Sequence, residues 1–259
     1  MRVGADPELF LKDGSGRFVS AVGKFGGTKK DPKPLATGWP GCFVQEDNVA
    51  VEFNIPPCER KDHFTFFINN CIKMIQSQAE QMHLELAIEP SAEFKDDQLD
   101  SEQARSFGCD PDFNVWTMAE NPPPRSPNPN LRSAGGHIHL EWGGSDKIGI
   151  ARAMDLFLGC PSIIYDPDLR RRSLYGKAGA IRFKPYGLEY RTLSNFWING
   201  YTDMIWEQLA QAVEFVMCPL DRDISKIFNK NLGLRINKCI NEADTEILKS
   251  LTKEFGLRY

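Results

Sequence analysis

Four short segments of this sequence combine paired polar residues with large apolar neighbours, and this pattern limits how the chain can fold. They are residues 4–8, 49–54, 135–139 and 187–191. In each segment the polar residues stand at i and i+2, so both side chains point to the same face of a strand. The flanking Val, Leu, Phe and Tyr residues favour burial of that strand. The sequence therefore predicts buried strands whose polar faces need a shared partner.

Two of the four histidines of the chain stand in the third segment. His137 and His139 follow Gly135 and Gly136, and glycines allow other groups to approach closely. The two imidazoles point to one face of the predicted strand and are largely neutral near pH 7. This spacing is typical of one wall of a metal or phosphate site.

The other three segments bring mainly carboxylates. They supply Asp6 and Glu8, Glu52 and Asn54, and Glu189 and Arg191. A buried charge is costly unless it is paired or coordinated, so convergence of these strands on divalent cations would resolve the charge problem of each. An oxygen-rich ligand set with one histidine suits Mg²⁺ or Mn²⁺ better than Zn²⁺. The sequence therefore indicates a carboxylate-rich metal site.

Each pair taken alone also has a simpler interpretation. Alternating polar and apolar residues are what a half-solvated antiparallel strand shows. Asp6 can cap a turn before Pro7, and Glu189 can form a structural ion pair with Arg191. The conjunction of four pairs favours the metal site, while these two simpler interpretations stay open.

Composition limits the class of protein. With 259 residues and 41% hydrophobic content, the chain can bury the core of one large domain. We expect a single domain over residues 1–259, with a helical C-terminal segment from about residue 221. The net charge of -4 and the lack of a dense basic cluster argue against a dedicated nucleic-acid binder. The three arginines at 170–172 either hold an anionic substrate or form a solvated run, and the solvated run is the favoured interpretation.

Cysteine usage and hydropathy indicate a location. The seven cysteines are widely spaced without a Cys-x-x-Cys pair, and no signal peptide precedes the first predicted strand, so we expect reduced thiols and a cytoplasmic protein. No apolar run approaches the roughly 18 residues that a membrane span needs. We therefore expect no membrane association.

Periodicity and turn residues predict the elements. Strands are expected at 2–11, 17–22, 43–54 with a turn near Asn48, 84–88, 181–183 and 188–192. Helices are expected at 61–83, 96–105, 147–165 and 202–216, and in most of the tail from 221. Residues 121–129 contain five prolines and predict an extended loop. Strands separated by long helices without a regular βαβ rhythm favour an α+β fold with helices on one face of a sheet.

Several motifs, taken together and in order, resemble one family of enzymes. They are Gly4-Ala-Asp-Pro-Glu8, Glu52-Phe-Asn54, Gly135-Gly-His-Ile-His139, Tyr175-Gly-Lys-Ala-Gly179 and Tyr186-Gly-Leu-Glu-Tyr-Arg191, the last followed by Thr192-Leu-Ser-Asn-Phe-Trp197. The set resembles the phage-type COOH-NH2 ligases (type 2), amidoligases of the glutamine synthetase and glutamate-cysteine ligase superfamily. The resemblance runs from residue 4 to about residue 200. It implies a fold like the glutamine synthetase catalytic domain, with a largely antiparallel, curved sheet.

The resemblance also implies an activity, cofactors and site residues. Such enzymes join a carboxylate to an amine with consumption of ATP, through an acyl phosphate, and two or three Mg²⁺ or Mn²⁺ ions hold the nucleotide phosphates. Carried over by position, the implied metal ligands are Asp6, Glu8, Glu52, His137 and Glu189. The groups implied to contact the nucleotide phosphates or the transferred phosphoryl group are His139, Lys177, Arg182 and Arg191. Asp6 stands where many relatives carry glutamate, which shortens that ligand by one methylene.

Substrates are implied only as a class. They are small molecules or peptides that carry a carboxylate and an amine, met in the host cytoplasm if a phage encodes the chain; their identity and the oligomeric state stay open. A carboxylate must accept a proton from the attacking amine, and Glu46 or Asp47 is the candidate. Asp110 and Asp112 either contact a substrate or form a turn around Pro111.

Two other functions remain as alternatives. A His-x-His pair also occurs in metal-dependent amide hydrolases, but those sites need further histidine ligands, and only His63 and His83 remain in this chain. A non-catalytic binding protein on the same fold is the third possibility. Its signature would be missing ligands, and the main ones are present.

Overall fold

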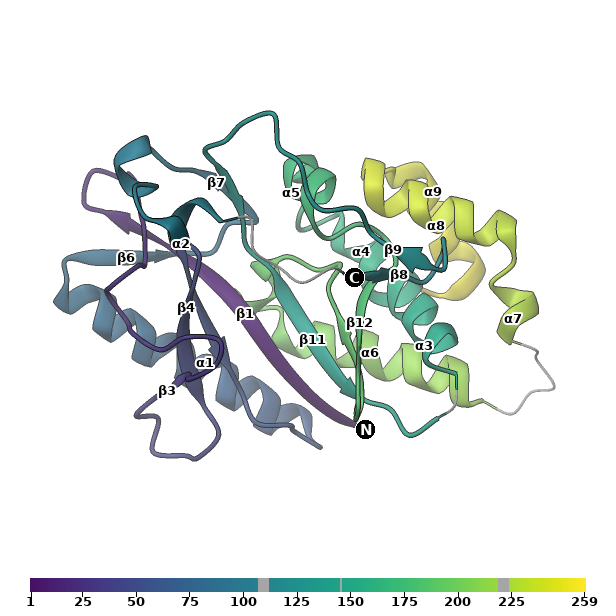
Figure 1. The fold of residues 1–259 in the computed structure, drawn as a ribbon. Helices are drawn as coiled ribbons and strands as arrows, with labels where there is room; N and C mark the ends of the chain where they lie inside the picture. Colours follow the sequence, from purple (N-terminus) through teal and green to yellow (C-terminus); the bar gives the residue numbers. More distant parts are fainter. Residues whose placement is uncertain (107–111, 145, 219–223) are drawn as a thin grey trace.

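A large antiparallel sheet forms the centre of the computed structural model, which describes residues 1–106, 112–144, 146–218 and 224–259 (Figure 1). Its strand order is β3-β4-β5-β1-β11-β13-β12-β8-β9, and β2 and β6 pair with β1 beside this path. The strands are β1 Arg2–Asp13, β2 Phe18–Val19, β3 Lys33–Pro34, β4 Phe43–Asp47, β5 Ala50–Asn54, β6 Leu84–Ala87, β8 Phe113–Asn114, β9 Ala119–Glu120, β11 Gly136–Glu141, β12 Ala180–Lys184 and β13 Gly187–Tyr190. The pairings between these described strands are all antiparallel.

Strand β1 organises the sheet because it pairs with four other strands. Residues 2–7 pair with β11, residues 8–9 with β5, and residues 10–13 with β2 and β6. Its odd-numbered residues Val3, Ala5, Leu9 and Leu11 belong to the main hydrophobic core. Because successive strand residues point to opposite faces, the even-numbered residues face away from that core. Asp6 and Glu8 therefore share one face of the sheet.

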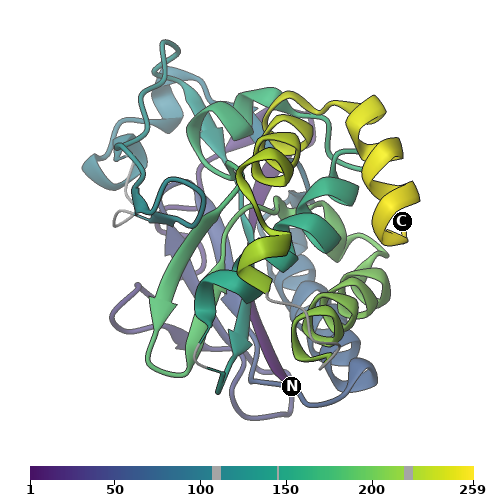
Figure 2. The same cartoon turned by 90° about the vertical axis from the view of Figure 1, so that its right-hand side faces the viewer.

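Helices lie on the core side of the sheet (Figure 2). They are α1 Lys61–Gln81, α3 Lys147–Met154, α4 Cys160–Ser162, α5 Leu169–Leu174, α6 Thr202–Met217, α7 Ile224–Ile227, α8 Lys230–Glu242 and α9 Thr245–Phe255. Of these, α1 and α3 lie against strands of the sheet, and α8 and α9 lie mainly against other helices. In α1 the buried residues Phe64, Ile68, Cys71, Ile75 and Ala79 recur every three or four positions. This spacing places them on one stripe of the helix, which explains why α1 packs along the sheet.

The predicted helix over 147–165 contains a break in its hydrogen-bond pattern. Between α3 and α4, residues Asp155–Gly159 form a π-helical turn whose residues are all buried. A π turn inside an α-helix is rare and is frequently found near functional sites.

A smaller apolar cluster lies on the opposite face of the sheet. It includes Phe10, an even-numbered residue of β1, together with Phe94 and Ala134, and the Phe10 and Phe94 ring centroids are 5.5 Å apart. The strands β7 Ser91–Glu93 and β10 Leu131–Ser133 pair to form a short second sheet, and Ala92 of β7 belongs to this cluster. The 3-10 turn Asp96–Gln98 and α2 Glu102–Arg105 complete this part of the fold.

The predicted α+β class, with helices packed on one face of a largely antiparallel sheet, is confirmed. The expected strand over 43–54 is a hairpin, and Asn48 at its turn has a φ of 56°. Periodicity missed the short strands β3, β7, β8, β9 and β10 and the short helix α5, because two to six residues are too few to show a period. Among the described residues, no helix is both long and apolar enough to cross a membrane.

Candidate active site

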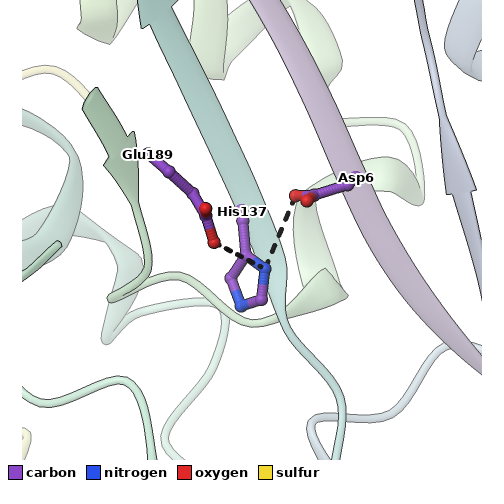
Figure 3. Close-up of side chains that lie close together, drawn as sticks. All are labelled: Asp6, His137 and Glu189. Carbon is purple, nitrogen blue, oxygen red and sulfur yellow. Dashed lines mark ion pairs between the residues drawn. The ribbon is translucent and has the colours of Figure 1, made fainter. Parts of the chain in front are cut away.

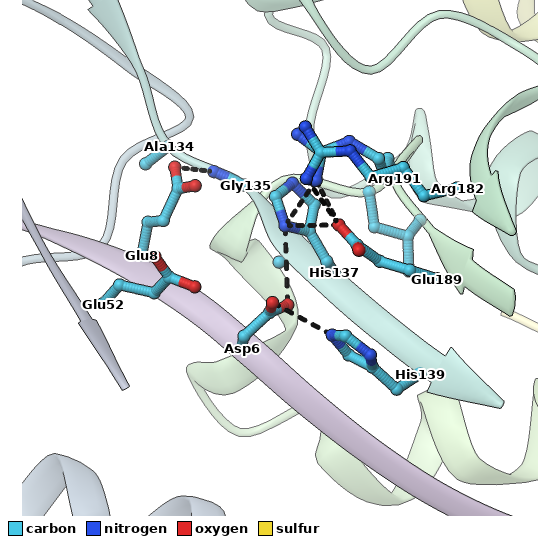
Figure 4. A network of polar contacts seen from close by, with 12 residues as sticks. Asp6, Glu8, Glu52, Ala134, Gly135, His137, His139, Arg182, Glu189 and Arg191 are labelled. Atoms are coloured by element: carbon cyan, nitrogen blue, oxygen red, sulfur yellow. Dashed lines mark hydrogen bonds and ion pairs between the residues drawn. The ribbon is translucent and has the colours of Figure 1, made fainter. Parts of the chain in front are cut away.

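The polar pairs predicted from the sequence meet on the face of the sheet that lies opposite the main core. Strand register places Asp6 opposite His137 and Glu8 opposite Glu52. Glu189 stands next to His139 on one side and next to Arg182 on the other side. Directly opposite residues on antiparallel strands point to the same face. Figure 4 shows contacts that join Asp6, His137, His139, Arg182, Glu189 and Arg191, with Glu8 and Glu52 lying beside this network.

One group of potential metal ligands joins Asp6, His137 and Glu189 (Figure 3). Nδ1 of His137 lies 3.5 Å from Oδ1 of Asp6 and 3.8 Å from Oε1 of Glu189. Oδ1 of Asp6 is buried and accepts no hydrogen bond, and Oδ2 of Asp6 lies 3.0 Å from Nε2 of His139. An unsatisfied buried carboxylate oxygen beside a histidine and a second carboxylate is a suitable arrangement for a divalent cation. We call these three residues the first cluster.

Cationic side chains surround Glu189 of the first cluster. Arg191 contacts it directly, Lys184 Nζ lies 2.8 Å from its Oε2, and Arg182 Nη1 lies 3.5 Å from its Oε1. Burial and Asp6 raise the pKa of Glu189, but Arg191 and the nearby histidines outweigh them and lower it to about 2. Glu189 is therefore ionised and charge-balanced by the chain itself.

The two histidines differ in protonation. Burial, together with the Arg191 guanidinium, lowers the pKa of His137 to about 4, so His137 is neutral at pH 7, as a metal ligand must be. Burial alone would lower the pKa of His139, but the adjacent Asp6 carboxylate raises it above its ordinary value. Nδ1 of His139 also lies 2.5 Å from the Tyr186 hydroxyl. A more basic His139 suits contact with an anion such as phosphate.

A second cluster of potential ligands joins Glu8, Asp47 and Glu52. Neutral groups donate to two of them: the backbone N–H of Gly135 to Glu8 at 2.7 Å and the Gln45 amide to Glu52 at 2.7 Å. Burial and the Asp47 carboxylate raise the pKa of Glu8 to about 7. Burial and the neighbouring carboxylates raise the pKa of Glu52 well above its ordinary value. Mutual repulsion of this kind is relieved when a divalent cation binds between the carboxylates.

Of the two candidate proton acceptors, Glu46 and Asp47, only Asp47 belongs to the second cluster. The Glu46 side chain accepts backbone N–H bonds from Gly23, Phe25 and Gly26 at 2.8, 2.8 and 2.6 Å. Glu46 therefore fixes the loop before β3 and does not face the clusters. Asp47, one residue later and on the other face of β4, belongs to the second cluster.

Two glycines next to His137 are required by close packing. A Cβ on Gly135 would lie 2.3 Å from Nε2 of His137, and a Cβ on Gly136 would lie 2.3 Å from the carbonyl oxygen of Ser194. Any larger residue would displace the imidazole or the backbone beside it. The expected role of these glycines in close approach is thus visible in the structure.

Lys177 lies apart from both clusters. It lines a cavity of about 50 Å³ with Tyr175, Asp112 and the proline run 122–124. Asp112 also lines a second small cavity of about 40 Å³ that reaches Glu8, and its Oδ2 lies 3.6 Å from Nε of Arg191. Lys177 therefore lies beside this cavity, whereas Arg182 and Arg191 contact the first cluster. Asp110 lies outside the described residues.

The expectation that residues 170–172 are solvated is wrong for two of the three arginines. Arg171 is 1% exposed and Arg172 is 4% exposed. The Arg171 guanidinium donates to the carbonyl oxygens of Ala134, Arg191, Thr192 and Leu193. It therefore ties the ends of β11 and β13 together, which explains its burial. Arg170 alone is exposed.

Two residues near the clusters, Lys184 and Tyr186, were not predicted as site residues, and only one had a clear signal. Lys184 stands two residues after Arg182 on β12, so strand periodicity would place both on the polar face. Tyr186 reaches the site from a turn. Its position depends on tertiary packing, which local pattern does not encode.

Cavities lie at both ends of the polar network. The larger one, about 340 Å³, is lined by His139, Tyr186, Asn54, Arg2 and neighbouring residues. The cavity of about 40 Å³ at the other end is lined by Glu8, Asp47, Asp112, Tyr175, Arg191 and neighbouring residues. The two clusters therefore lie between a larger and a smaller cavity.

Comparisons with known proteins agree with the motifs. Residues 128–247 match the family described as Phage phiEco32-like COOH.NH2 ligase-type 2. This segment contains His137, His139, Lys177, Arg182, Glu189 and Arg191. The match confirms the resemblance for the motifs that lie within residues 128–247, whereas the motifs at residues 4–8 and 52–54 lie outside it. No curated protein matches the chain in sequence.

Solved structures with a similar chain path include two of GmaS. "Apo GmaS without ligand" is 14% identical with a TM-score of 0.48, and the alignment covers 96% of this chain and 64% of that chain. "GmaS/ADP complex-Conformation 1" is 13% identical with a TM-score of 0.43, and the alignment covers 98% of this chain and 68% of that chain. This chain therefore spans about two thirds of the length of each.

Proposed function

We propose that this chain is an ATP-dependent carboxylate-amine ligase that forms an amide bond through an acyl phosphate. The observation that carries the proposal is the adjacency of two carboxylate clusters and several cations on one sheet face. The match of residues 128–247 to a COOH-NH2 ligase family supports it.

The donor sets fit divalent cations. Asp6, His137 and Glu189 would hold one ion, and Glu8, Glu52 and Asp47 would hold another, with Mg²⁺ or Mn²⁺ preferred by oxygen-rich sites. Bound cations of this kind neutralise the charge of nucleotide phosphates during phosphoryl transfer. Phosphoryl transfer depends mainly on positioning and charge neutralisation, which these residues can supply.

The larger cavity gives the nucleotide a place beside the first cluster. We propose that the nucleoside occupies the space lined by His139 and Tyr186 and that the phosphates extend towards the acids. His139 would then donate to a phosphate oxygen, and the forked guanidinium groups of Arg182 and Arg191 would bind the transferred phosphoryl group. Lys177, at the smaller end, would contact the acyl phosphate or the substrate carboxylate.

The proposed reaction has two steps. A substrate carboxylate oxygen attacks the γ-phosphorus of ATP, the bond to ADP breaks, and an acyl phosphate forms. The amine nitrogen then attacks the acyl carbon, inorganic phosphate leaves, and the nitrogen loses a proton. Asp47 and Asp112 line the smaller cavity and are the carboxylates placed to accept that proton.

The chain offers little support for a metal-dependent amide hydrolase. Such a site needs further histidine ligands, but His63 lies on the exposed face of α1 and His83 is exposed after that helix. Both are therefore outside the two clusters. A purely binding protein is disfavoured because each predicted ligand position holds a suitable side chain.

Phosphate release provides the main test. The protein would be incubated with ATP, Mg²⁺ or Mn²⁺, and pools of amino acids, polyamines and peptides, and products would be identified by mass spectrometry. We expect phosphate release that requires both a carboxylate and an amine, and a reduction of about 1,000-fold in Glu52→Gln. Glu85→Gln, exposed on β6, is the matched control and should behave as wild type. Hydrolysis without ATP, or equal rates for Glu52→Gln and wild type, would contradict the proposal.

Isotope transfer tests the intermediate separately. With a substrate whose carboxylate carries ¹⁸O, the acyl phosphate route moves one labelled oxygen into inorganic phosphate. An adenylate route would instead place the label in AMP. Label in AMP, or none in phosphate while amide is formed, would exclude the acyl phosphate but leave the ligase activity standing.

A further inference from the structure

A buried carboxylate lies behind the candidate site and has no role in the proposed chemistry. Asp155, at the start of the π-helical turn, is 0% exposed. The Tyr190 hydroxyl donates to its Oδ1 at 2.7 Å, and the indole N–H of Trp116 donates to its Oδ2 at 2.6 Å. The Thr192 hydroxyl lies 3.2 Å from Oδ1, and the backbone N–H of Gly179 also donates to the carboxylate.

These donors come from segments that carry site residues. Tyr190 and Thr192 stand on either side of Arg191 in the sequence, and Tyr190 also follows Glu189. Because successive strand residues point to opposite faces, Tyr190 contacts Asp155 on the core face while Glu189 belongs to the first cluster on the opposite face. Asp155 therefore contacts the core face of β13, while Glu189 and Arg191 lie on the opposite face.

The other donors link Asp155 to the smaller cavity. Gly179 ends the loop that contains Lys177, and the Thr192 hydroxyl lies 3.0 Å from the carbonyl oxygen of Lys177. Trp116 belongs to the turn between β8 and β9, and Asp112 immediately precedes β8. One carboxylate thus connects the backs of three segments that frame the site.

A purely packing role does not explain a carboxylate at this position. A buried charge in the core is unfavourable unless it is fully hydrogen-bonded, and an apolar residue would fill the same space. An ionised carboxylate accepts at both oxygens, so it can satisfy the Tyr190 hydroxyl and the Trp116 indole together. An amide in its place would turn an N–H₂ towards one of these donors.

We propose that Asp155 is a positioning residue for the candidate active site. By holding Tyr190, Gly179 and Trp116 from behind, it sets the positions of β13 and of the loop that carries Lys177. Its kinetic consequence rests on the proposed ligase function, whereas its effect on metal affinity does not.

The test compares Asp155→Asn with a buried aspartate elsewhere. Asp166→Asn is the matched control, since Asp166 is 2% exposed and its Oδ2 lies 3.7 Å from Nη2 of Arg172 on α5. Mn²⁺ affinity would be measured by electron paramagnetic resonance, at a temperature where circular dichroism shows each variant folded. We expect Asp155→Asn to weaken Mn²⁺ binding about 10-fold and to lower kcat more than it changes KM for ATP. Asp166→Asn should lose stability but keep the wild-type Mn²⁺ affinity.

The outcomes separate this proposal from the proposed function. Weaker Mn²⁺ binding in Asp155→Asn with no ATP-dependent turnover in wild type would remove the ligase but keep the positioning role. Unchanged Mn²⁺ affinity and unchanged kcat in folded Asp155→Asn would overturn the positioning role, as would a wild-type protein that neither binds Mn²⁺ nor turns over. If Asp155→Asn does not fold, Tyr190→Phe replaces it, because this variant removes one donor and keeps the carboxylate. We expect about a 3-fold loss of Mn²⁺ affinity there, and no change would count against the proposal.

Discussion

The two acid clusters lie next to each other on one sheet face, yet their charges are balanced in different ways. Glu189 of the first cluster is in contact with Arg182, Lys184 and Arg191, and its pKa falls to about 2. Glu8 of the second cluster accepts a hydrogen bond from a backbone N–H, and burial with the nearby Asp47 raises its pKa to about 7. The first cluster is largely neutralised by the chain itself. In the second cluster the pKa values of Glu8, Asp47 and Glu52 are raised although Arg191 acts on Glu8 and Asp47, so this cluster keeps an excess of negative charge that a bound cation or protons would offset.

This difference separates stability from function within one site. Removing an acid from the first cluster should damage the fold, because it leaves cations buried without their partner. Removing an acid from the second cluster should relieve repulsion in the metal-free protein and damage only metal binding and activity. Three measurements test this difference between the two clusters.

The largest expected effect is on stability in EDTA. Glu189→Gln leaves Arg182, Lys184 and Arg191 without the carboxylate they share, and loss of one partner from a buried ion pair costs about 3–5 kcal/mol. Glu52→Gln removes a repelling charge, so we expect its unfolding free energy to stay within about 1 kcal/mol of wild type or to rise. Urea denaturation measures both. Equal losses in the two variants would show that the clusters do not differ as described.

The next effect is the pH dependence of the metal-free protein. Folding raises the pKa of Glu8 from 4.5 to about 7, so the folded state retains a proton that the unfolded chain has released. The contribution of Glu8 is therefore most favourable below about pH 4.5 and is lost as the pH rises through about 7. Since Glu8 is only partly buried by exposed area, we expect a modest loss of about 2 kcal/mol between about pH 5 and pH 8.

Magnesium should reverse most of that loss at about pH 8, because a cation replaces the protons in the second cluster. Glu189 does not contribute in this window: its pKa is lowered from 4.5 to about 2, so its stabilisation is lost only as the pH falls below about 4. Chemical denaturation across pH, with EDTA or with Mg²⁺, measures both. A flat profile in EDTA, or an unchanged profile in Glu52→Gln, would contradict the account of the second cluster.

The smallest effect separates the two histidines. His137, with its pKa near 4 and its contact to Asp6 and Glu189, should act as a metal ligand, so His137→Ala should weaken Mn²⁺ binding about 10-fold. His139, beside the larger cavity, should affect the nucleotide, so His139→Ala should raise KM for ATP about 5-fold with less change in Mn²⁺ affinity. Isothermal titration with Mn²⁺ and steady-state kinetics test the pair. If His139→Ala instead weakened Mn²⁺ binding and His137→Ala raised KM for ATP, the two roles would have to be exchanged.

Much of the sheet and most of the polar face could be predicted from the sequence, because strand periodicity is a local property. The i and i+2 spacing indicated that the polar residues of each strand share one face of that strand; these residues include Asp6, Glu8, Glu52, His137 and Glu189. The apolar stripe of α1 predicted that helix. What brings these residues together is strand register, which the sequence does not state directly. Only the resemblance to a family indicated that these strands lie side by side. The pairings of β1 with β5 and β11 show this arrangement in the structure.

The remaining residues were hidden because tertiary contacts override local pattern. Glu46 and Asp47 are adjacent acids in a short strand, and only the hairpin geometry decides which one faces the site. Arg171 and Arg172 are read from the sequence as a solvated run, yet they are buried because backbone carbonyl groups from distant segments accept their hydrogen bonds. Asp155 stands in a mostly apolar helix, and nothing in the sequence shows that Trp116 and Tyr190 meet it.

The polar residues at the even positions of β1 also influence which strand alignment forms during folding. Asp6 faces His137, and Glu8 faces Glu52, only when β1 pairs with its neighbours in the observed alignment. A shift by one residue would turn both acids into the apolar core and expose Val3 and Leu9 instead. The Asp6 and Glu8 carboxylates therefore also disfavour a shifted register, since a misaligned strand would bury them in the apolar core without partners. A molecule that reaches the native state has by then also assembled its ligands.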